Sequence, residues 1–429
     1  MIKLLAGGIV IALLALFLPG LELAIVPYNV GMLVAALVSA YTAPRVGRLT
    51  VRRRFDQVLS VRVQNRVELI VTNDGVERIV GRLRDCPSTD LVPTKVEFPL
   101  DLGPNRDVVF SYHVCPRYRG TDEFGDVLVR VRGRFGLVEV EHRIPCAQPA
   151  RIYPNVLALR EFELLKQRGK LNLMGIRKSR IKGQGTEFES LREYHDDDYR
   201  RIDWKSTARR GKLVVRDYET EKNQPVIVCI DAGRNMLAEV NGVPKLDIAL
   251  DASLMLLHAA KTGGDQTGLL VFADRVLSFV PPRKSRGQEG AILDAIHDLQ
   301  ADAVEPDYDQ AMSYLASRWK RRSLIVVFTD AEDEAQAKRL STALSAIRRR
   351  HLVMVVRVSD PHVKEMARLF IGSDRDVFQR AAALWYQTER RLAEINLTTG
   401  GVQSIDSEPQ DLAQALVSAY LVAKETAAI

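Results

Sequence analysis

Short apolar runs alternate with helical segments from residue 225 onward, and this alternation constrains the fold more than any other feature of the sequence. Strands that are buried on both faces read as continuous apolar runs, and they need helices on both sides to cover them. The pattern therefore predicts a doubly wound, mostly parallel α/β sheet over residues 223–429. The apolar runs are 226–230, 268–273, 324–328 and 352–356, and helical spacing occurs at 245–261, 288–299, 309–318, 335–348, 376–395 and 411–424.

A different pattern, alternation with a period of two residues, covers residues 45–155. Runs such as 58–63, 67–72 and 126–132 alternate apolar and polar side chains, as half-buried antiparallel strands do. Turn sequences such as Asn73-Asp-Gly separate them. We therefore expect a small β-sandwich-like domain here. The polar and mixed residues 156–222 then form a separate segment before the α/β domain.

The first 44 residues are dominated by two uncharged stretches, 4–21 and 23–43. Each is about the length of roughly 20 residues that a helix needs to cross a bilayer core. Basic side chains flank the pair, and the single charge between the stretches, Glu22, is acidic. By the positive-inside rule this predicts a two-helix transmembrane hairpin over residues 1–44, in the bacterial inner membrane, with the remaining domains in the cytoplasm. A cleaved signal peptide is the competing interpretation. The flanking basic residues are Lys3, Arg45, Arg48, Arg52, Arg53 and Arg54.

Charge and cysteine spacing argue against a nucleic-acid-binding protein and against a zinc protein. The net charge of +7 comes from 61 basic and 54 acidic side chains, a mild surplus that suits a solvated surface or an acidic partner. The basic stretch 160–182 lacks interleaved aromatic residues, so we expect no nucleic-acid partner. None of the four cysteines lies at metal-ligand spacing, which argues against a zinc site.

Two of the apolar runs end in an aspartate, at Asp231 and Asp330. Sites in open α/β sheets form at the carboxyl ends of strands beside a topological switch point. The pair resembles the metal-ion-dependent adhesion site of von Willebrand factor A domains, in which oxygen ligands hold a hard cation. Asn235 stands where that site has its second serine, while Gly233 replaces the first. The resemblance implies a degenerate site with Asp231, Asn235 and Asp330 as candidate Mg²⁺ ligands; alternatively, the aspartates cap loops and helix starts.

The segment before this domain carries a second resemblance. It runs from Gly185-Thr-Glu-Phe through Leu191-Arg-Glu-Tyr to Arg201-Ile-Asp-Trp and Ala208-Arg. This closely resembles the signature of domain-of-unknown-function family 58 (DUF58), whose members end in a von Willebrand factor A-like domain. The acidic residues 196–198 replace the family's usual Pro-Gly-Asp turn. From the residues alone, we expect Trp204 to anchor this segment on the α/β domain. The signature positions are Glu187, Phe188, Leu191, Arg192, Tyr194, Asp198, Arg201, Trp204, Ala208 and Arg209.

The family resemblance implies a function in binding, without catalysis. DUF58 proteins often accompany MoxR-type AAA ATPases, so the resemblance implies a scaffold that acts in the assembly of protein complexes with such an ATPase. The alternative is a metal-dependent hydrolase or nuclease that uses Asp231 and Asp330. A two-metal site needs several converging carboxylates, and the sequence offers two clear candidates.

Overall fold

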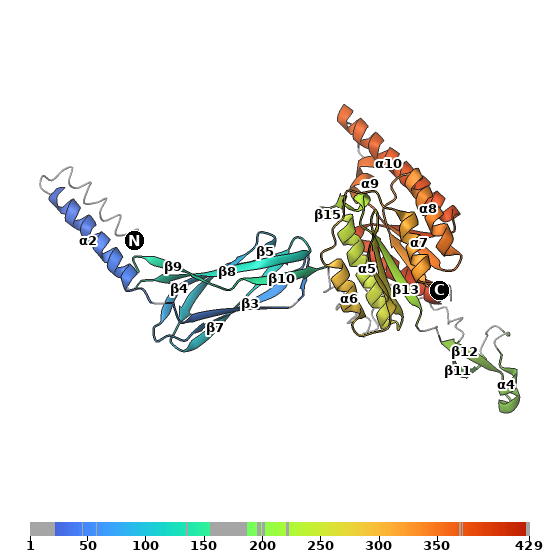
Figure 1. Cartoon of the computed structure of the whole chain (residues 1–429), viewed down its shortest axis with the longest axis horizontal. Coiled ribbons are helices and arrows are strands. Elements are labelled where there is room, and N and C mark those ends of the chain that lie inside the picture. The colour runs from blue at the N-terminus through green and yellow to red at the C-terminus, as the bar shows by residue number, and fades with distance from the viewer. Residues whose placement is uncertain are drawn as a thin grey trace. The chain divides into compact units, whose positions relative to one another are not determined.

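The computed structural model describes residues 22–44, 46–56, 58–133, 136–154, 187–194, 199, 202–219, 223–368, 370 and 372–425 (Figure 1). The chain divides into two compact units, Met1–Tyr153 and Pro154–Ile429. The first unit is built from two mainly antiparallel sheets, in which only β2 and β10 pair in parallel among the described strands, and the second contains a six-stranded mixed sheet covered by helices.

The first unit contains two β-sheets that share one core. One sheet has the order β1-β3-β7-β5, and the other has the order β2-β10-β8-β4-β6, with β9 paired to β8. In β3, Val67, Leu69 and Val71 are fully buried while the residues between them are not, which is the period-two pattern of a half-buried strand. The strands are β1 (Leu49–Phe55), β2 (Leu59–Ser60), β3 (Asn65–Asn73), β4 (Ile79–Pro87), β5 (Leu91–Pro93), β6 (Glu97–Leu102), β7 (Arg106–Pro116), β8 (Gly120–Arg132), β9 (Glu139–Ile144) and β10 (Gln148–Tyr153).

A buried ion pair joins the two sheets inside this core. Arg53 on β1 pairs with Asp85 on β4, and the side chains of both are 0% exposed. Arg53 also donates to the backbone carbonyls of Cys146 (2.7 Å) and Gly125 (2.8 Å). The Tyr112 hydroxyl donates to Asp85, and burial together with this carboxylate raises the pKa of Tyr112. Every charge in the cluster therefore has a partner, as a buried ion pair requires.

The predicted transmembrane hairpin is wrong. In the part of the chain that the structure describes, no helix combines the length and the apolar character needed to cross a bilayer, and the first uncharged stretch, 4–21, lies outside that part. The second stretch forms α2 (Glu22–Tyr41), with Pro27 inside the helix and the Asn29 amide bonded to the Ile25 carbonyl at 2.8 Å. The uninterrupted run 30–40 is only about 16 Å long at 1.5 Å per residue, against a bilayer core of about 30 Å.

The predicted location, a multi-pass protein of the inner membrane, is also wrong, because it depended on the transmembrane hairpin. One of the arginines counted as a membrane flank also has another role. Arg53 is buried in the core of the first unit, while its neighbours Arg52 and Arg54 are exposed on β1.

The second unit is a six-stranded sheet with the order β17-β16-β13-β18-β19-β20. All neighbouring strands are parallel except β16 and β17. The central strand, β13, has all seven residues buried, as expected for a strand covered on both faces. The strands are β13 (Pro225–Asp231), β16 (Gln266–Phe272), β17 (Val276–Arg283), β18 (Leu324–Phe328), β19 (Leu352–Val358) and β20 (Gln403–Ser407).

Helices cover the two faces of this sheet (Figure 1), and a separate hydrophobic core lies on each face. Val226, Val228 and Ile230 of β13 pack against α5, α6 and α11, whereas Ile227 and Cys229 face α7, α8 and α10. The helices are α5 (Lys245–Thr262), α6 (Gln288–Ile296), α7 (Tyr308–Arg318), α8 (Glu334–Arg348), α9 (Pro361–Ala367), α10 (Asp374–Thr399) and α11 (Pro409–Glu425).

The strand order fixes where a site can form. From β13 the chain passes to β16 on one side and later returns to β18 on the other. This reversal makes the gap between the carboxyl ends of β13 and β18 the topological switch point of the sheet. Asp231 is the last residue of β13, and Asp330 follows β18 after Thr329.

Candidate functional site

Asp231 is held by two hydrogen bonds and is fully buried. Its Oδ1 accepts from the Gly233 backbone N–H at 2.7 Å, and its Oδ2 accepts from the Thr329 hydroxyl at 2.6 Å. The Tyr308 hydroxyl lies 2.9 Å from that of Thr329. A Cβ on Gly233 would lie 2.9 Å from the Val304 carbonyl oxygen and 3.0 Å from Asp231 Oδ1. This close approach explains why a glycine stands at the position of the expected serine.

The environment of Asp231 disfavours its charged form. Burial raises the pKa of Asp231 to about 6. The hydrogen bonds from Thr329 and Gly233 lower this pKa, whereas the negative charges of Asp330 and Glu305 raise it further. The carboxylate is thus surrounded by neutral donors and other acids.

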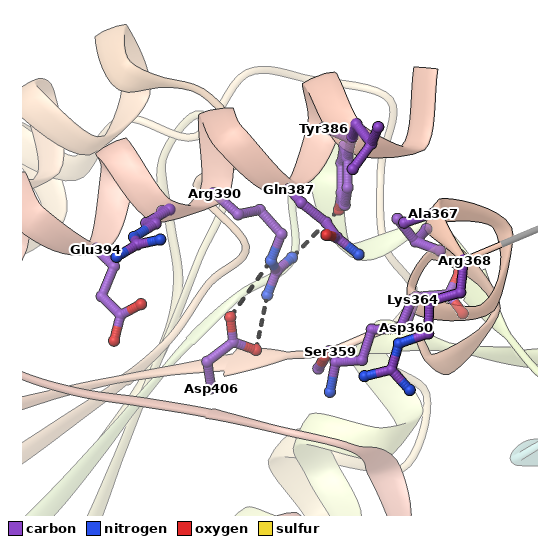
Figure 2. A pocket seen from close by; sticks show the side chains of 13 residues that line it. Ser359, Asp360, Lys364, Ala367, Arg368, Tyr386, Gln387, Arg390, Glu394 and Asp406 are labelled. Atoms are coloured by element: carbon purple, nitrogen blue, oxygen red, sulfur yellow. Dashed lines mark hydrogen bonds and ion pairs between the residues drawn. The ribbon is translucent and has the colours of Figure 1, made fainter. Parts of the chain in front are cut away.

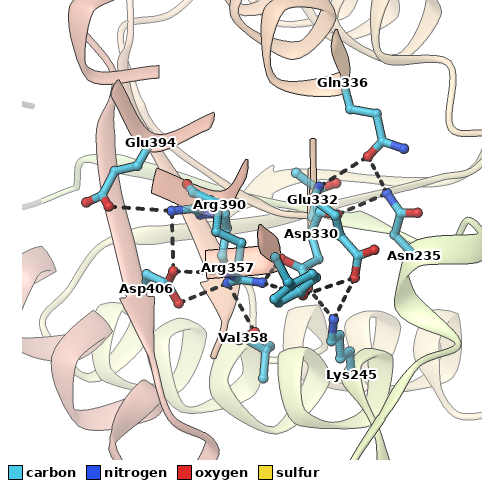
Figure 3. Close-up of polar contacts among 12 residues, drawn as sticks. Asn235, Lys245, Asp330, Glu332, Gln336, Arg357, Val358, Arg390, Glu394 and Asp406 are labelled. Atoms are coloured by element: carbon cyan, nitrogen blue, oxygen red, sulfur yellow. Dashed lines mark hydrogen bonds and ion pairs between the residues drawn. The ribbon is translucent and has the colours of Figure 1, made fainter. Parts of the chain in front are cut away.

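Asp330 has the opposite environment, because two cations neutralise it. Lys245, the first residue of α5, donates from Nζ to Oδ2 of Asp330, and Arg390 on α10 donates to Oδ1 at 2.7 Å (Figure 3). Burial alone would raise the pKa of Asp330, but Arg390 and Lys245 outweigh burial and hold it below its usual value. Lys245 also contacts Glu332 Oε1 at 3.0 Å. Both oxygens of Asp330 therefore already face a cation of the chain itself.

Arg390 connects this pair to the neighbouring strands. Its guanidinium lies 3.0 Å from Asp406 Oδ1 on β20 and donates to the Val358 carbonyl at 3.2 Å. Arg357 on β19 is fully buried beside it, donates to the Arg390 carbonyl at 3.1 Å and lies 3.3 Å from Asp406 Oδ2 (Figure 3). The charges of α10, β19 and β20 thus form one network with Asp330.

Asn235 turns its amide nitrogen toward Asp330. Its Nδ2 donates to the Asp330 backbone carbonyl at 2.9 Å and to Gln336 Oε1 at 2.8 Å. Gln336 Oε1 also accepts from the Glu332 backbone N–H at 3.2 Å. Because both partners of Asn235 are acceptors, its nitrogen and not its oxygen faces the site.

These donors do not fit a divalent cation held jointly by Asp231, Asn235 and Asp330. A hard cation needs several converging oxygens. Here an ammonium and a guanidinium lie against Asp330, Asn235 presents N–H groups, and Gly233 has no side-chain oxygen. Asp307, the acidic residue before α7, caps that helix by accepting the Gln310 N–H at 2.8 Å. Among the residues that the structure describes, no group of three or more His, Cys, Asp or Glu side chains could hold a metal ion.

The environment of Asp231 predicts a specific dependence of stability on pH. The folded-state pKa of about 6 lies above the ordinary value of 3.8, so the folded protein binds this proton more tightly than the unfolded chain. Ionised Asp231 therefore destabilises the fold above pH about 6, and the penalty disappears below pH about 4. Asp231→Asn should be neutral at low pH and stabilising by up to about 3 kcal/mol at pH 7, because its amide can bond both Gly233 and Thr329.

Urea denaturation between pH 4 and 8 measures this difference, followed by the fluorescence of Trp319, whose indole donates to Ser323 Oγ at 2.7 Å. Asp309→Asn, an exposed residue of α7, is the control and should show no such trend. If the difference in unfolding free energy between Asp231→Asn and the parent did not change with pH, the raised pKa of Asp231 would be contradicted.

A cavity of about 490 Å³ opens beside Arg390, between α9, α10 and β20 (Figure 2). Side chains of both signs line it, among them Lys364, Arg368, Glu394 and Asp406. Because Arg390 and Asp406 belong to both the cavity wall and the buried network, the network reaches the surface here.

The described signature residues lie on a small hairpin and a short helix that precede the α/β sheet in the chain. Glu187, Phe188, Leu191 and Arg192 lie on β11 (Glu187–Glu193), which pairs with β12 (Val214–Glu219), and Tyr194 follows, with its N–H bonded to the Leu213 carbonyl at 3.0 Å. Asp198 and Arg201 lie outside the described residues. Trp204, Ala208 and Arg209 are on α4 (Trp204–Arg210) and are exposed.

Trp204, which we expect to anchor the segment, is 66% exposed on α4. Asp203 instead fixes the start of α4, where its Oδ1 accepts the backbone N–H groups of Lys205 and Ser206, each at 3.0 Å. The signature therefore includes a helix cap and an exposed aromatic residue.

The sequence analysis identified neither of the two cations that pair with Asp330, Lys245 and Arg390. A signal was present for Lys245, since a lysine at the start of a helix faces the positive end of the helix dipole and is unfavourable without a compensating partner. Arg390 carries no such signal, because its spacing within α10 reads as an ordinary charged position.

Comparison with known proteins agrees with the resemblance noted in the sequence. Uncharacterized proteins of Mycobacterium tuberculosis and Mycobacterium bovis are 30% identical to this chain over 213 residues, which are 49% of this chain and 66% of theirs. The chain thus spans just under two thirds of the length of these relatives.

Two solved structures show a low similarity to this chain. The conserved hypothetical protein BatB from Bacteroides thetaiotaomicron is 15% identical, with coverage of 47% of this chain and 98% of BatB and a TM-score of 0.33. Proximal thread matrix protein 1 from the mussel byssus, solved with zinc in its MIDAS motif, is 12% identical, with coverage of 47% of each chain and a TM-score of 0.27. Residues 190–370 match the family described as "Protein of unknown function DUF58". This match identifies residues 190–370 of the chain as a DUF58 region.

Proposed function

We propose that this chain is a non-enzymatic binding protein whose α/β unit recognises a protein partner without a bridging metal. The binding face lies at the carboxyl ends of β13 and β18. The observation that carries the proposal is the double neutralisation of Asp330 by Lys245 and Arg390. A carboxylate that is fully buried and paired in this way is not available to hold a catalytic metal or to act as a base.

The rim of this face is suited to polar recognition. Arg234 and Glu305 form an ion pair of 2.8 Å and their side chains are 55% and 41% exposed. Glu332 is also partly exposed while it contacts Lys245. Exposed, partly paired charges contribute mainly to specificity and rate of association. The family resemblance suggests a MoxR-type AAA ATPase as the partner and a scaffold in protein-complex assembly as the role.

The first test is calorimetric titration of Mg²⁺ and Mn²⁺ into the full chain. We expect no saturable binding and no increase in melting temperature. Saturable binding that disappears in Asp231→Ala would show that the face uses a metal, and it would overturn the metal-free part of the proposal.

The second test measures binding of a purified MoxR-type ATPase from the same organism to the full chain. Arg234→Ala at the rim should weaken the complex by about tenfold, a loss of about 1.4 kcal/mol. Arg349→Ala is the matched control, because Arg349 is exposed and precedes β19, at the amino end of the strands. No complex with the parent chain, or equal losses for both variants, would argue against this partner or this face.

A further inference from the structure

Helix α10 has two faces with opposite properties. One face packs on the body of the second unit, where α10 lies against α8 and α9. The other face is solvent-exposed, and α10 extends past α8 at the top of the unit in Figure 1. The buried residues of α10 are Ala383, Arg390, Ala393 and Leu397.

The exposed face carries a continuous row of large apolar side chains. Phe378 is 76% exposed and Trp385 is 67% exposed. Six large apolar residues are exposed on this helix. At 100° per residue they fall within an arc of about 120°, centred opposite the buried residues. Exposed apolar patches of this kind mark interaction sites. This apolar stripe consists of Val377, Phe378, Leu384, Trp385, Leu392 and Ile395.

We propose that the apolar stripe is the interface through which two copies of this chain associate, with their α10 helices antiparallel. The stripe is suited to a copy of itself. Large side chains at 378, 385 and 392 recur every seven residues, and smaller ones at Ala381 and Thr388 lie between them. In an antiparallel pair centred near residue 383, Trp385 faces Ala381 of the second copy and Phe378 faces its Thr388. At these two levels a large residue then meets a small one, as packing between helices requires.

The charges beside the stripe support the same arrangement. Arg375 and Glu389 lie on one flank of the stripe, about four helical turns apart. In the antiparallel pair, Arg375 of each copy lies near Glu389 of the other, so the two-fold axis forms two opposite-charge pairs. A two-fold interface must be complementary to itself in this way.

Charge reversal on the full chain tests the arrangement. Sedimentation equilibrium should show a concentration-dependent dimer. Glu389→Arg places arginines opposite each other in both pairs, and Arg375→Glu does the same with glutamates, so each should weaken the dimer by about tenfold or more. The combined variant Arg375→Glu/Glu389→Arg restores opposite charges and should recover most of the affinity.

Glu365→Arg on α9 is the matched control, because its side chain is 77% exposed and it lies off the stripe. It should leave the dimer unchanged. Trp385→Glu should abolish the dimer while the monomer keeps its circular dichroism. A chain that is monomeric at all concentrations, or a combined variant as weak as the single ones, would overturn the proposal. Neither result depends on binding of an ATPase, so this proposal and the proposed function fail separately.

Discussion

Asp330→Ala is expected to destabilise the second unit by about 3–5 kcal/mol, the typical loss when one partner of a buried ion pair is removed. The change leaves Lys245 and Arg390 without their shared carboxylate. Lys245 is 4% exposed at its side chain and Arg390 is 10% exposed, so water replaces the lost carboxylate only in part, from the side of the cavity beside Arg390. The remaining acids, Glu332 and Asp406, offset only part of the loss.

The measurement is urea denaturation followed by Trp319 fluorescence at pH 7. Asp309→Ala is the control, since this aspartate is exposed in the first turn of α7 and should cost less than about 1 kcal/mol. A loss below 1 kcal/mol for Asp330→Ala would mean that the network contributes little and that the cations reorganise freely.

Arg53→Met is expected to destabilise the first unit by a similar amount, about 3–5 kcal/mol. It leaves Asp85 buried without its cation, and the carbonyls of Cys146 and Gly125 lose their donors. Arg53→Met/Asp85→Leu removes both charges and should recover part of the loss, because no unpaired charge remains, although the Tyr112 hydroxyl and the two carbonyls still lack their partners.

The three tryptophans of the chain, at 204, 319 and 385, all lie outside the first unit. Far-ultraviolet circular dichroism must therefore follow its unfolding. Arg52→Met, on the exposed side of the same strand, is the control and should change stability by less than about 0.5 kcal/mol. Equal effects of Arg52→Met and Arg53→Met would contradict the buried ion pair.

The parallel sheet was predictable because its strands are buried on both faces. Val226 to Ile230 and Leu324 to Phe328 are continuous apolar runs, and the structure pairs them as β13 and β18. The carboxyl ends of these strands meet at the switch point, so the proximity of Asp231 and Asp330 also followed from the sequence.

The chemistry of the site was less predictable, because it depends on contacts between distant residues. Asp231 and Asp330 look alike in the sequence, each at the end of an apolar run. Their surroundings differ because Lys245 and Arg390, 85 and 60 positions from Asp330, reach only one of them. The role of Arg53 was also unpredictable from its charge. An arginine after an apolar stretch fits a membrane flank and a buried ion pair equally well, and only the contact with Asp85 decides between them.

Both cations on Asp330 are part of the chain, and this changes how the face responds to its surroundings. The occupancy of a bound metal follows mass action and falls when the free ion is scarce or chelated. The Lys245 ammonium is tethered, so its occupancy does not depend on any concentration. The face therefore presents the same charges in low magnesium as in high magnesium. Only a rearrangement of α5 or α10, and not the ionic composition of the solvent, can remove the positive charges from this carboxylate.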